Sequence, residues 1–505
     1  MKKTLLLLLA GLIYFVGGFA YTPTPFNFHN YSVAHKRATL PSKYDSRELG
    51  IILPSRDQGQ TNTCWAYTAC DVAQTLFHKN GSESGYLSPA VYTNCAKELG
   101  FKDICIDSGG NEGITTAMNN MLKAPVYLET TGEIVKGDDD CPDYSVEDIH
   151  AYISETSDLP KRDKYAIKEA IMKYGSVFSS MFYEDEYFNS QTNFYEFINE
   201  EEEEEGEEEK DISNHAISIV GWDDEKEAWL VRNTWGPTWG DDGYFWVSYK
   251  DTEVDKKCVS FNSFISTKEI DNVYTYSKTG STGDFGFVQA NKPTSILIAY
   301  DIEKGESIEY ISTYIVHPNT KVQIVVQDSE DNTVLYEGKE ETIKYSGMYS
   351  HKLTTPVKSN GETLLVQICY TANYSYAVPI ERVQENYNEG ITISDNQWLY
   401  NGGWMPIGKD TNYPFNIVAY IYTKKDNSTA IDETESENKI SVLTAGQINP
   451  EIWKTAIRIN IFDISGRNFG SLKPNDTMPN LSNGYYILVV DHKDGTFTTE
   501  RFNKF

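Results

Sequence analysis

Long apolar runs are almost absent from this sequence. Only the stretch from Leu5 to Phe19 is continuously apolar, and no later segment approaches the roughly 18 residues that a membrane-spanning helix needs. That stretch follows a basic start at residues 1–3 and ends in small residues, a pattern typical of a secretory signal peptide. No cysteine near its end is placed to carry a lipid anchor. We therefore predict export through residues 1–20 and no transmembrane segment in the remaining chain.

Basic charge is also scarce. Lys and Arg total 44 against 74 Asp and Glu, which gives a formal net charge of −30. Such an excess repels phosphate groups, so nucleic acids and anionic membranes are not expected partners. The densest acidic block, residues 200–209, contains nine glutamates around Gly206 without the spacing of a coordination motif. We predict a solvated insertion there, with a cation site as the weaker alternative, and we expect neither a metal nor a cofactor.

Cysteine is limited to seven positions, at Cys64, Cys70, Cys95, Cys105, Cys141, Cys258 and Cys369. An exported protein meets an oxidising compartment, so these cysteines are candidates for disulfides. Setting Cys64 aside leaves six, and the sequence alone does not choose among their pairings.

Cys64 stands where a thiol is reactive. It opens an apolar, helically spaced run to about His78, and the unpaired N–H groups at a helix N-terminus lower the pKa of a thiol. The same N–H groups stabilise an oxyanion, and the amide of Gln58, six residues earlier, is a candidate second donor. We predict that Cys64 is a nucleophile and Gln58 an oxyanion residue.

Two later segments supply a base and its partner. A buried-looking strand begins at His215, and a second one ends in Asn233 and Trp235. An amide oxygen that accepts from one imidazole nitrogen sets the tautomer and aims the other nitrogen at the thiol, while an indole keeps water away. Alone, a cysteine or histidine at such a position is usually a packing residue. Their joint occurrence favours catalysis.

These motifs resemble the papain family of cysteine peptidases. The match rests on Gln58 and on segments 64–66, 214–216 and 233–244, which fall in the family's order. The resemblance covers about residues 41–268 and implies hydrolysis of peptide bonds through an acyl-enzyme. The residues that it implies as catalytic are Gln58, Cys64, His215 (general base and acid) and Asn233. The residues that it implies as substrate-binding are Gly109, Gly110, Ser213, Asn214 and Trp235.

The resemblance carries two further expectations. By family position, Cys95 with Cys141 is the favoured disulfide. Residues 21–40 are far shorter than the helical inhibitory propeptide of many family members, and this argues against zymogen control.

Helical patterns are confined to the first half of the chain. After the run that begins at Cys64, a second helix is expected to begin at 87–91, with Ser88 as a candidate N-cap and Pro89 in its first turn. Segments 114–122 and 164–174 are two further expected helices, and the pattern changes to strands after Val177.

A β-rich pattern follows. From about Asp271 to Thr423, short alternating segments such as 321–326 and 363–368 recur between turns, the pattern of a β-sandwich. The stretch from residue 390 to 404 resembles the lectin-like domain that follows some secreted bacterial papain-like peptidases. Trp398 and Trp404 are candidates for stacking on sugar rings, and buried packing is the alternative.

The last residues form another β-rich piece. Residues 426–440 are rich in Ser, Thr, Asn and Glu and are typical of a linker. Beyond them, segments 457–467 and 480–490 alternate like strands and resemble the C-terminal sorting domain of the type IX secretion pathway. This resemblance implies passage across an outer membrane, with release or retention at the cell surface.

The predicted fold class is α+β: a papain-like two-lobed peptidase domain, a β-sandwich lectin-like domain and a small C-terminal β-sandwich domain. The predicted boundaries are 1–20 signal peptide, 21–40 N-terminal segment, 41–268 peptidase, 271–425 lectin-like domain, 426–440 linker and 441–505 sorting-like domain. The favoured function is a secreted cysteine peptidase acting on proteins or peptides, with a carbohydrate or cell-surface ligand for the β domain. The alternative is a surface adhesin or carbohydrate-binding protein that uses the peptidase fold as a scaffold.

Overall fold

The computed structural model divides at Asp426 into two compact units, which are described separately. The described residues are 21–35, 39–82, 85–102, 104, 109–122, 141, 151–199, 211–286, 290–426, 443–444, 447–448, 450–463, 468–474, 476–479, 481, 484–493 and 497–504. The predicted signal peptide, the glutamate block at 200–209 and Cys105 lie outside them.

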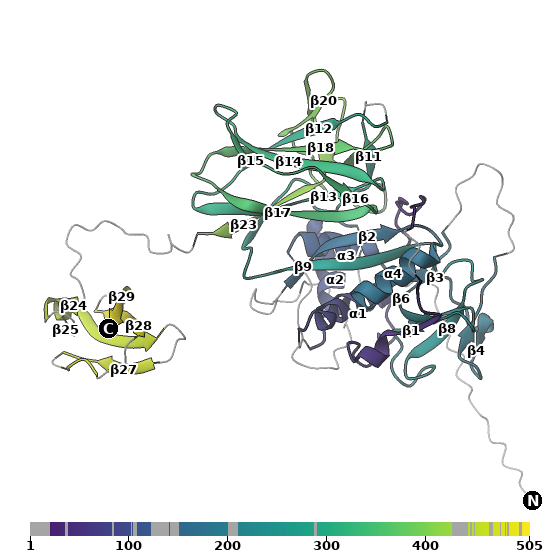
Figure 1. Cartoon of the computed structure of the whole chain (residues 1–505), viewed down its shortest axis with the longest axis horizontal. Coiled ribbons are helices and arrows are strands. Elements are labelled where there is room, and N and C mark those ends of the chain that lie inside the picture. Colours follow the sequence, from purple (N-terminus) through teal and green to yellow (C-terminus); the bar gives the residue numbers. More distant parts are fainter. Residues whose placement is uncertain are drawn as a thin grey trace, which may run out of the picture. The chain divides into compact units, whose positions relative to one another are not determined.

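The first part of the larger unit begins with a helical lobe (Figure 1). Its helices are α1 (Cys64–Lys79), α2 (Pro89–Cys95) and α3 (Glu112–Asn120). The start of α1 at Cys64 and of α2 at Pro89, with Ser88 as N-cap residue, was predicted from the sequence. α1 is buried from Cys64 to Phe77, because it packs on α2 and α3 on one side and on the sheet on the other. The favoured disulfide between Cys95 and Cys141 is confirmed.

A nine-stranded sheet forms the second lobe, in the order β2-β9-β3-β6-β7-β8-β5-β4 with β1 paired to β6. Its strands are β1 (Lys43–Asp45), β2 (Ala151–Leu159), β3 (Val177–Met181), β4 (Phe188–Asn189), β5 (Phe194–Tyr195), β6 (His215–Asp223), β7 (Ala228–Arg232), β8 (Tyr244–Ser248) and β9 (Cys258–Ser266). Helix α4 (Lys164–Tyr174), predicted with these bounds, packs on this sheet.

Strand β2 escaped the sequence analysis, which placed the first strand of this lobe after Val177. Its sequence contains Ser154, Thr156, Ser157 and Asp158, all of them buried, so it does not show the apolar alternation of a half-buried strand. Pairing with β9 along its length satisfies its backbone.

The remainder of the larger unit, residues 271–426, is a β-sandwich whose layers are visible in Figure 1. One layer is a seven-stranded sheet, and four- and three-stranded sheets form the other. Its strands are β10 (Asn272–Tyr274), β11 (Gly283–Phe285), β12 (Thr294–Asp301), β13 (Glu306–Ile315), β14 (Thr320–Asp328), β15 (Val334–Glu337), β16 (Glu341–Ile343), β17 (Gly347–Lys358), β18 (Thr363–Thr371), β19 (Val378–Glu381), β20 (Gln397–Tyr400), β21 (Trp404–Ile407), β22 (Asn416–Ile417) and β23 (Ala419–Lys425). Alternating side chains of β12, β14 and β18 point into a shared apolar core, as the sequence predicted.

The sandwich shares a core with the preceding lobes. Tyr314, Met348 and Tyr420 belong to the same buried cluster as α1. Strand β17 lies beside β2, where the Asp158 N–H donates to the Ser346 carbonyl at 2.9 Å. The next residue, Gly347, has φ +130°, and a Cβ there would lie 2.3 Å from the Thr156 carbonyl oxygen. Only glycine allows this approach, so the contact between the two folds is built into the chain.

The smaller unit contains an antiparallel sheet in the order β27-β26-β28-β29 and a β24-β25 pair. Its strands are β24 (Leu443–Thr444), β25 (Gln447–Ile448), β26 (Ala456–Asp463), β27 (Asn468–Leu472), β28 (Gly484–His492) and β29 (Phe497–Lys504). Ile459, Ile461, Leu488 and Val490 form its core. Much of the turn motif on which the sorting-domain resemblance rests, residues 464–467, 480 and 482–483, lies outside the described residues.

Candidate active site

Cys64 and His215 lie at the same corner of the larger unit. Cys64 is the first residue of α1, and its Sγ accepts a hydrogen bond from the backbone N–H of Ala216 at 3.3 Å. Ala216 follows His215, the first residue of β6. The fold thus brings together a thiol and an imidazole that are about 150 residues apart in the chain.

The hydrogen bonds of Asn233 fix the tautomer of His215. Asn233 Oδ1 accepts from the Thr234 backbone N–H at 2.8 Å, so this atom is the amide oxygen. His215 Nε2 lies 2.8 Å from the same oxygen and must therefore be the donor. A neutral imidazole that donates from Nε2 has its lone pair on Nδ1, the nitrogen available as a base.

Trp235 covers the His215–Asn233 pair. Its ring stacks on the imidazole with centroids 4.8 Å apart and an interplanar angle of 29°. Edge contacts with Tyr183 and Trp239 hold the indole in turn. Asn233 is completely buried, which keeps water from competing for its hydrogen bond to His215.

Gln58 is fixed next to this pair through Thr234. Its backbone N–H donates to the Thr234 carbonyl at 2.8 Å, and its Oε1 accepts from the Thr234 hydroxyl. Its Nε2 donates to the Thr61 carbonyl at 2.6 Å. One of the two amide hydrogens is used there, and the other is available for an oxyanion. Thr234 was not singled out from the sequence, because a threonine between Asn233 and Trp235 carries no signal of its own.

The predicted substrate-binding residues lie on both sides of Cys64. Gly109 and Gly110 precede α3, and a Cβ on Gly110 would lie 2.4 Å from the Trp65 ring, so the backbone there approaches α1 closely. On the sheet side, Asn214 Oδ1 accepts from the Tyr183 backbone N–H at 2.8 Å and its Nδ2 donates to the Tyr183 carbonyl at 3.1 Å. The Ser213 hydroxyl, also predicted, accepts from Ser180 at 3.2 Å.

The residues that precede the lobes bridge these two sides. The Tyr21 N–H donates to the Asn214 carbonyl and the Thr22 N–H to the Gly110 carbonyl, each at 3.1 Å. Tyr21 and Gly110 pair as a parallel β-bridge. The N-terminal segment (residues 21–35) thus lies across the site, a placement that its shortness did not predict.

With the segment in place, Cys64 and His215, the predicted nucleophile and base, are buried and neutral. Cys64 is fully buried and His215 is 3% exposed. Burial raises the pKa of the Cys64 thiol to about 12, although the N–H groups of Ala216, Trp65 and Cys64 itself oppose the rise. Burial lowers the pKa of His215 to about 4, although the hydrogen bond that the ring donates to Asn233 opposes the fall. A desolvated site disfavours both charged forms, so the described state is a thiol beside a neutral imidazole.

Comparison with known families agrees with this arrangement. Residues 40–266 match the family described as papain family cysteine protease. These residues form a papain-family cysteine peptidase domain. Residues 273–435 match the family described as lectin like domain, so a lectin-like β-rich domain follows the peptidase domain.

The similarity to individual curated relatives covers less than half of this chain. The chain is 25% identical over 224 residues to thiol protease aleurain-like of Arabidopsis thaliana, covering 42% of this chain and 57% of the relative. It is 26% identical over 218 residues to cathepsin L of Sarcophaga peregrina, covering 41% and 58%. The chain therefore spans little more than half the length of these relatives.

Solved structures extend the likeness to both folds. The cysteine protease and lectin-like domains of Cwp84, a surface layer associated protein of Clostridium difficile, match with a TM-score of 0.65 at 18% identity, covering 78% of this chain and 91% of the other. A structure of Clostridial cysteine protease Cwp84 after propeptide cleavage matches with a TM-score of 0.66 at 20% identity, covering 76% and 100%. At this identity the likeness concerns the fold.

Within the described residues, no group of three or more His, Cys, Asp or Glu side chains is arranged to hold a metal ion. No helix in the described part of the chain is long and apolar enough to cross a membrane.

Proposed function

We propose that the protein is an exported cysteine peptidase that hydrolyses peptide bonds through an acyl-enzyme on Cys64. The observation that carries the proposal is the hydrogen bond from His215 Nε2 to Asn233 Oδ1. The next residue after His215 is Ala216, and its backbone N–H donates to the Cys64 thiol. Together these two hydrogen bonds support the assignment of a nucleophile, a base and an orienting residue, in a segment that matches the peptidase family.

The reaction assigns a step to each group. His215 Nδ1 first takes the thiol proton, and the Cys64 thiolate then attacks the peptide carbonyl. The carbonyl oxygen becomes an oxyanion that accepts from the Gln58 amide and the Cys64 backbone N–H. The C–N bond then breaks, and the imidazolium returns its proton to the leaving amine. Water, deprotonated by His215, attacks the thioester, and the acid product leaves as the thiol is restored.

The N-terminal segment is proposed to hold the enzyme inactive until it is displaced. It is bonded to Gly110 and Asn214, the residues proposed to bind substrate backbone, so substrate and segment exclude each other. The fold neighbour described after propeptide cleavage supports this reading.

The second domain is proposed to bind carbohydrate or a cell-surface ligand. Trp404 and Tyr400 are 42% and 46% exposed on the β20–β21 hairpin, with ring centroids 5.4 Å apart. Exposed aromatic faces suit sugar rings, whereas Trp398 on the same hairpin is partly buried and less exposed than either. The proposal also includes export through residues 1–20 and the domain boundaries given above. It further assigns the C-terminal unit a sorting role in type IX secretion.

The test uses the full chain after limited proteolysis removes the N-terminal segment. A thiol-directed epoxide should label Cys64, and the labelled fraction should equal the fraction of peptide-cleaving activity lost. Cys64→Ala should lose labelling and cleavage together. Cleavage by a folded Cys64→Ala protein would refute the mechanism, and a wild-type protein that binds glycans without labelling or cleaving would favour the adhesin alternative.

A further inference from the structure

The side chain of Tyr21 fills a pocket beside Cys64. Tyr21 is completely buried, and its hydroxyl donates to Glu112 Oε2 at 2.8 Å. Its backbone is fixed at Asn214, next to His215, so the distance from the main chain to Glu112 is spanned by one tyrosine side chain. The occupant of the pocket in this state is therefore a tyrosine side chain of the protein itself.

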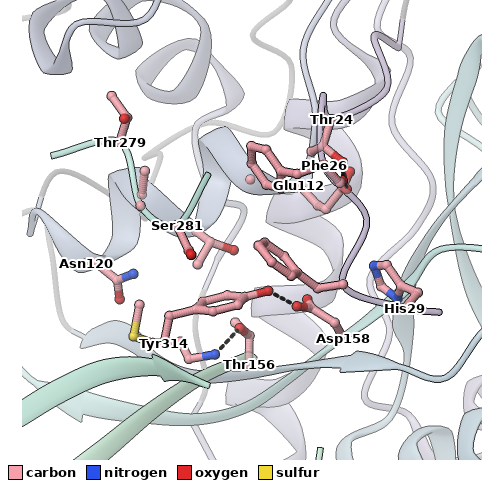
Figure 2. A pocket seen from close by; sticks show the side chains of 16 residues that line it. Thr24, Phe26, His29, Glu112, Asn120, Thr156, Asp158, Thr279, Ser281 and Tyr314 are labelled. Atoms are coloured by element: carbon pink, nitrogen blue, oxygen red, sulfur yellow. Dashed lines mark hydrogen bonds between the residues drawn. The ribbon is translucent and has the colours of Figure 1, made fainter. Parts of the chain in front are cut away.

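Glu112 stands at the inner end of this pocket, on the first turn of α3. It is 6% exposed, and its Oε1 has a second, longer contact with the Thr24 hydroxyl at 3.5 Å. Figure 2 shows Glu112 beside Thr24 and Phe26, at the edge of the cavity between the peptidase domain and the lectin-like domain. Thr24 directs its single hydroxyl proton to the Phe26 carbonyl at 2.9 Å, so the side-chain donor that the N-terminal segment gives this carboxylate is the Tyr21 hydroxyl, beside the backbone N–H of Glu112 itself.

A cation lies nearby but is already paired. Lys257 Nζ lies 2.9 Å from Asp211 Oδ2 and 3.3 Å from the Thr24 hydroxyl. Burial raises the pKa of Glu112, and the positive charge of Lys257 is the largest opposing effect. A second ammonium group brought into this enclosed space would meet Lys257, so the pocket disfavours a lysine side chain.

We propose that Glu112 determines substrate specificity by selecting a tyrosine side chain near the scissile bond. When the N-terminal segment leaves, Tyr21 leaves with it, and Glu112 Oε2 loses the hydroxyl that donates to it. A substrate tyrosine replaces that hydroxyl at the depth where Tyr21 held it. Phenylalanine fills the same volume but leaves Glu112 Oε2 without this donor, and such sites reject the analogue that lacks the hydroxyl.

This inference rests on the proposed function but has its own test. The activated full chain is given pairs of fluorogenic peptides that differ only in Tyr or Phe, with the variable residue moved through the positions on either side of the scissile bond. At one position, we expect kcat/KM to favour Tyr by roughly tenfold or more. Glu112→Met, which keeps the length but removes the acceptor, should bring that ratio close to one.

A matched control separates recognition of the side chain from recognition of the backbone. The Asn111 side-chain amide donates to the Thr22 carbonyl at 3.0 Å, so its hydrogen bond to the N-terminal segment is to the main chain. Asn111→Ser keeps an N-cap residue on α3 but removes this donor. It should lower kcat/KM for the Tyr and Phe peptides by the same factor and leave their ratio unchanged.

The intact chain offers a second readout that needs no turnover. Tyr21→Phe and Glu112→Met should each speed alkylation of Cys64, and the double variant should be no faster than the faster single one, because both remove the same hydrogen bond. Additive effects in this cycle, or equal Tyr and Phe cleavage by an enzyme whose Cys64 is labelled, would overturn the inference while leaving the peptidase intact. Absence of both labelling and cleavage would remove the proposed function, and the inference with it.

Discussion

Thr22→Pro tests whether the N-terminal segment suppresses the thiol of Cys64. The substitution deletes the Thr22 N–H that donates to Gly110 and disturbs Tyr21 next to it. Thr22→Ala is the matched control, because it retains the N–H and removes only the side chain.

The expected magnitude follows from the burial of Cys64. A thiol with a pKa of about 12 carries roughly a thousandfold less thiolate at neutral pH than one at its ordinary 9.0. When the segment is displaced, water returns to the site, and the pKa of Cys64 falls while that of His215 rises from about 4. The two then form a thiolate–imidazolium pair. We expect alkylation of Cys64 at pH 7 to accelerate by at least roughly tenfold in Thr22→Pro, with the midpoint of the pH–rate profile at lower pH.

The assay follows the Cys64 peptide by mass spectrometry after timed exposure to iodoacetamide. This resolves Cys64 from the buried thiols of Cys70 and Cys258 and from the partly exposed Cys369. Rates and pH profiles that are identical in the wild type, Thr22→Ala and Thr22→Pro would refute the reasoning. They would mean that the N-terminal segment does not control the thiol in solution.

Three further predictions concern catalysis, domain coupling and pH. Asn233→Ala should lower kcat roughly tenfold to hundredfold and His215→Ala by more, because the first only loosens the ring; equal losses in activity assays would contradict an orienting role. A chain ending at Lys268 exposes the core surface that Tyr314, Met348 and Tyr420 cover, and it loses about 1.5–3 kcal/mol of stability for each large side chain removed. Its urea midpoint should therefore fall sharply, or it should not fold. An unchanged midpoint would argue against the shared core. Burial lowers the pKa of His29 to about 4 and raises that of Asp158 to about 7, so His29 reduces stability as pH falls from its ordinary 6.5 and Asp158 reduces it as pH rises from its ordinary 3.8. Between about pH 4 and 6.5 these two contributions therefore oppose each other. Asp158→Asn should make the free energy of unfolding rise more steeply with pH, and His29→Gln should make it rise less steeply or fall. If both variants keep the wild-type pH dependence, this opposition is excluded.

The sequence alone predicted the elements that local rules govern. Helix α1 begins at Cys64 because its apolar residues recur at helical spacing, and α2 begins at Pro89 because proline suits a first helical turn. The strands of the β-sandwich were predictable from their period-two alternation. The sequence also singled out Cys64, His215 and Asn233 as one group, because four separated motifs resemble one family in order, and the structure brings these residues together.

Only the tertiary structure decided what depends on contacts between distant residues. The polar strand β2 has no pattern of its own and is a strand because β9 and β17 flank it. The fifteen-residue N-terminal segment gave no sign of its position, since Tyr21 meets Glu112 across 91 residues of chain. The protonation of Cys64 and His215 likewise depends on burial by other segments. Spacing identified the groups that can react, whereas packing determined that in this state they are covered and neutral.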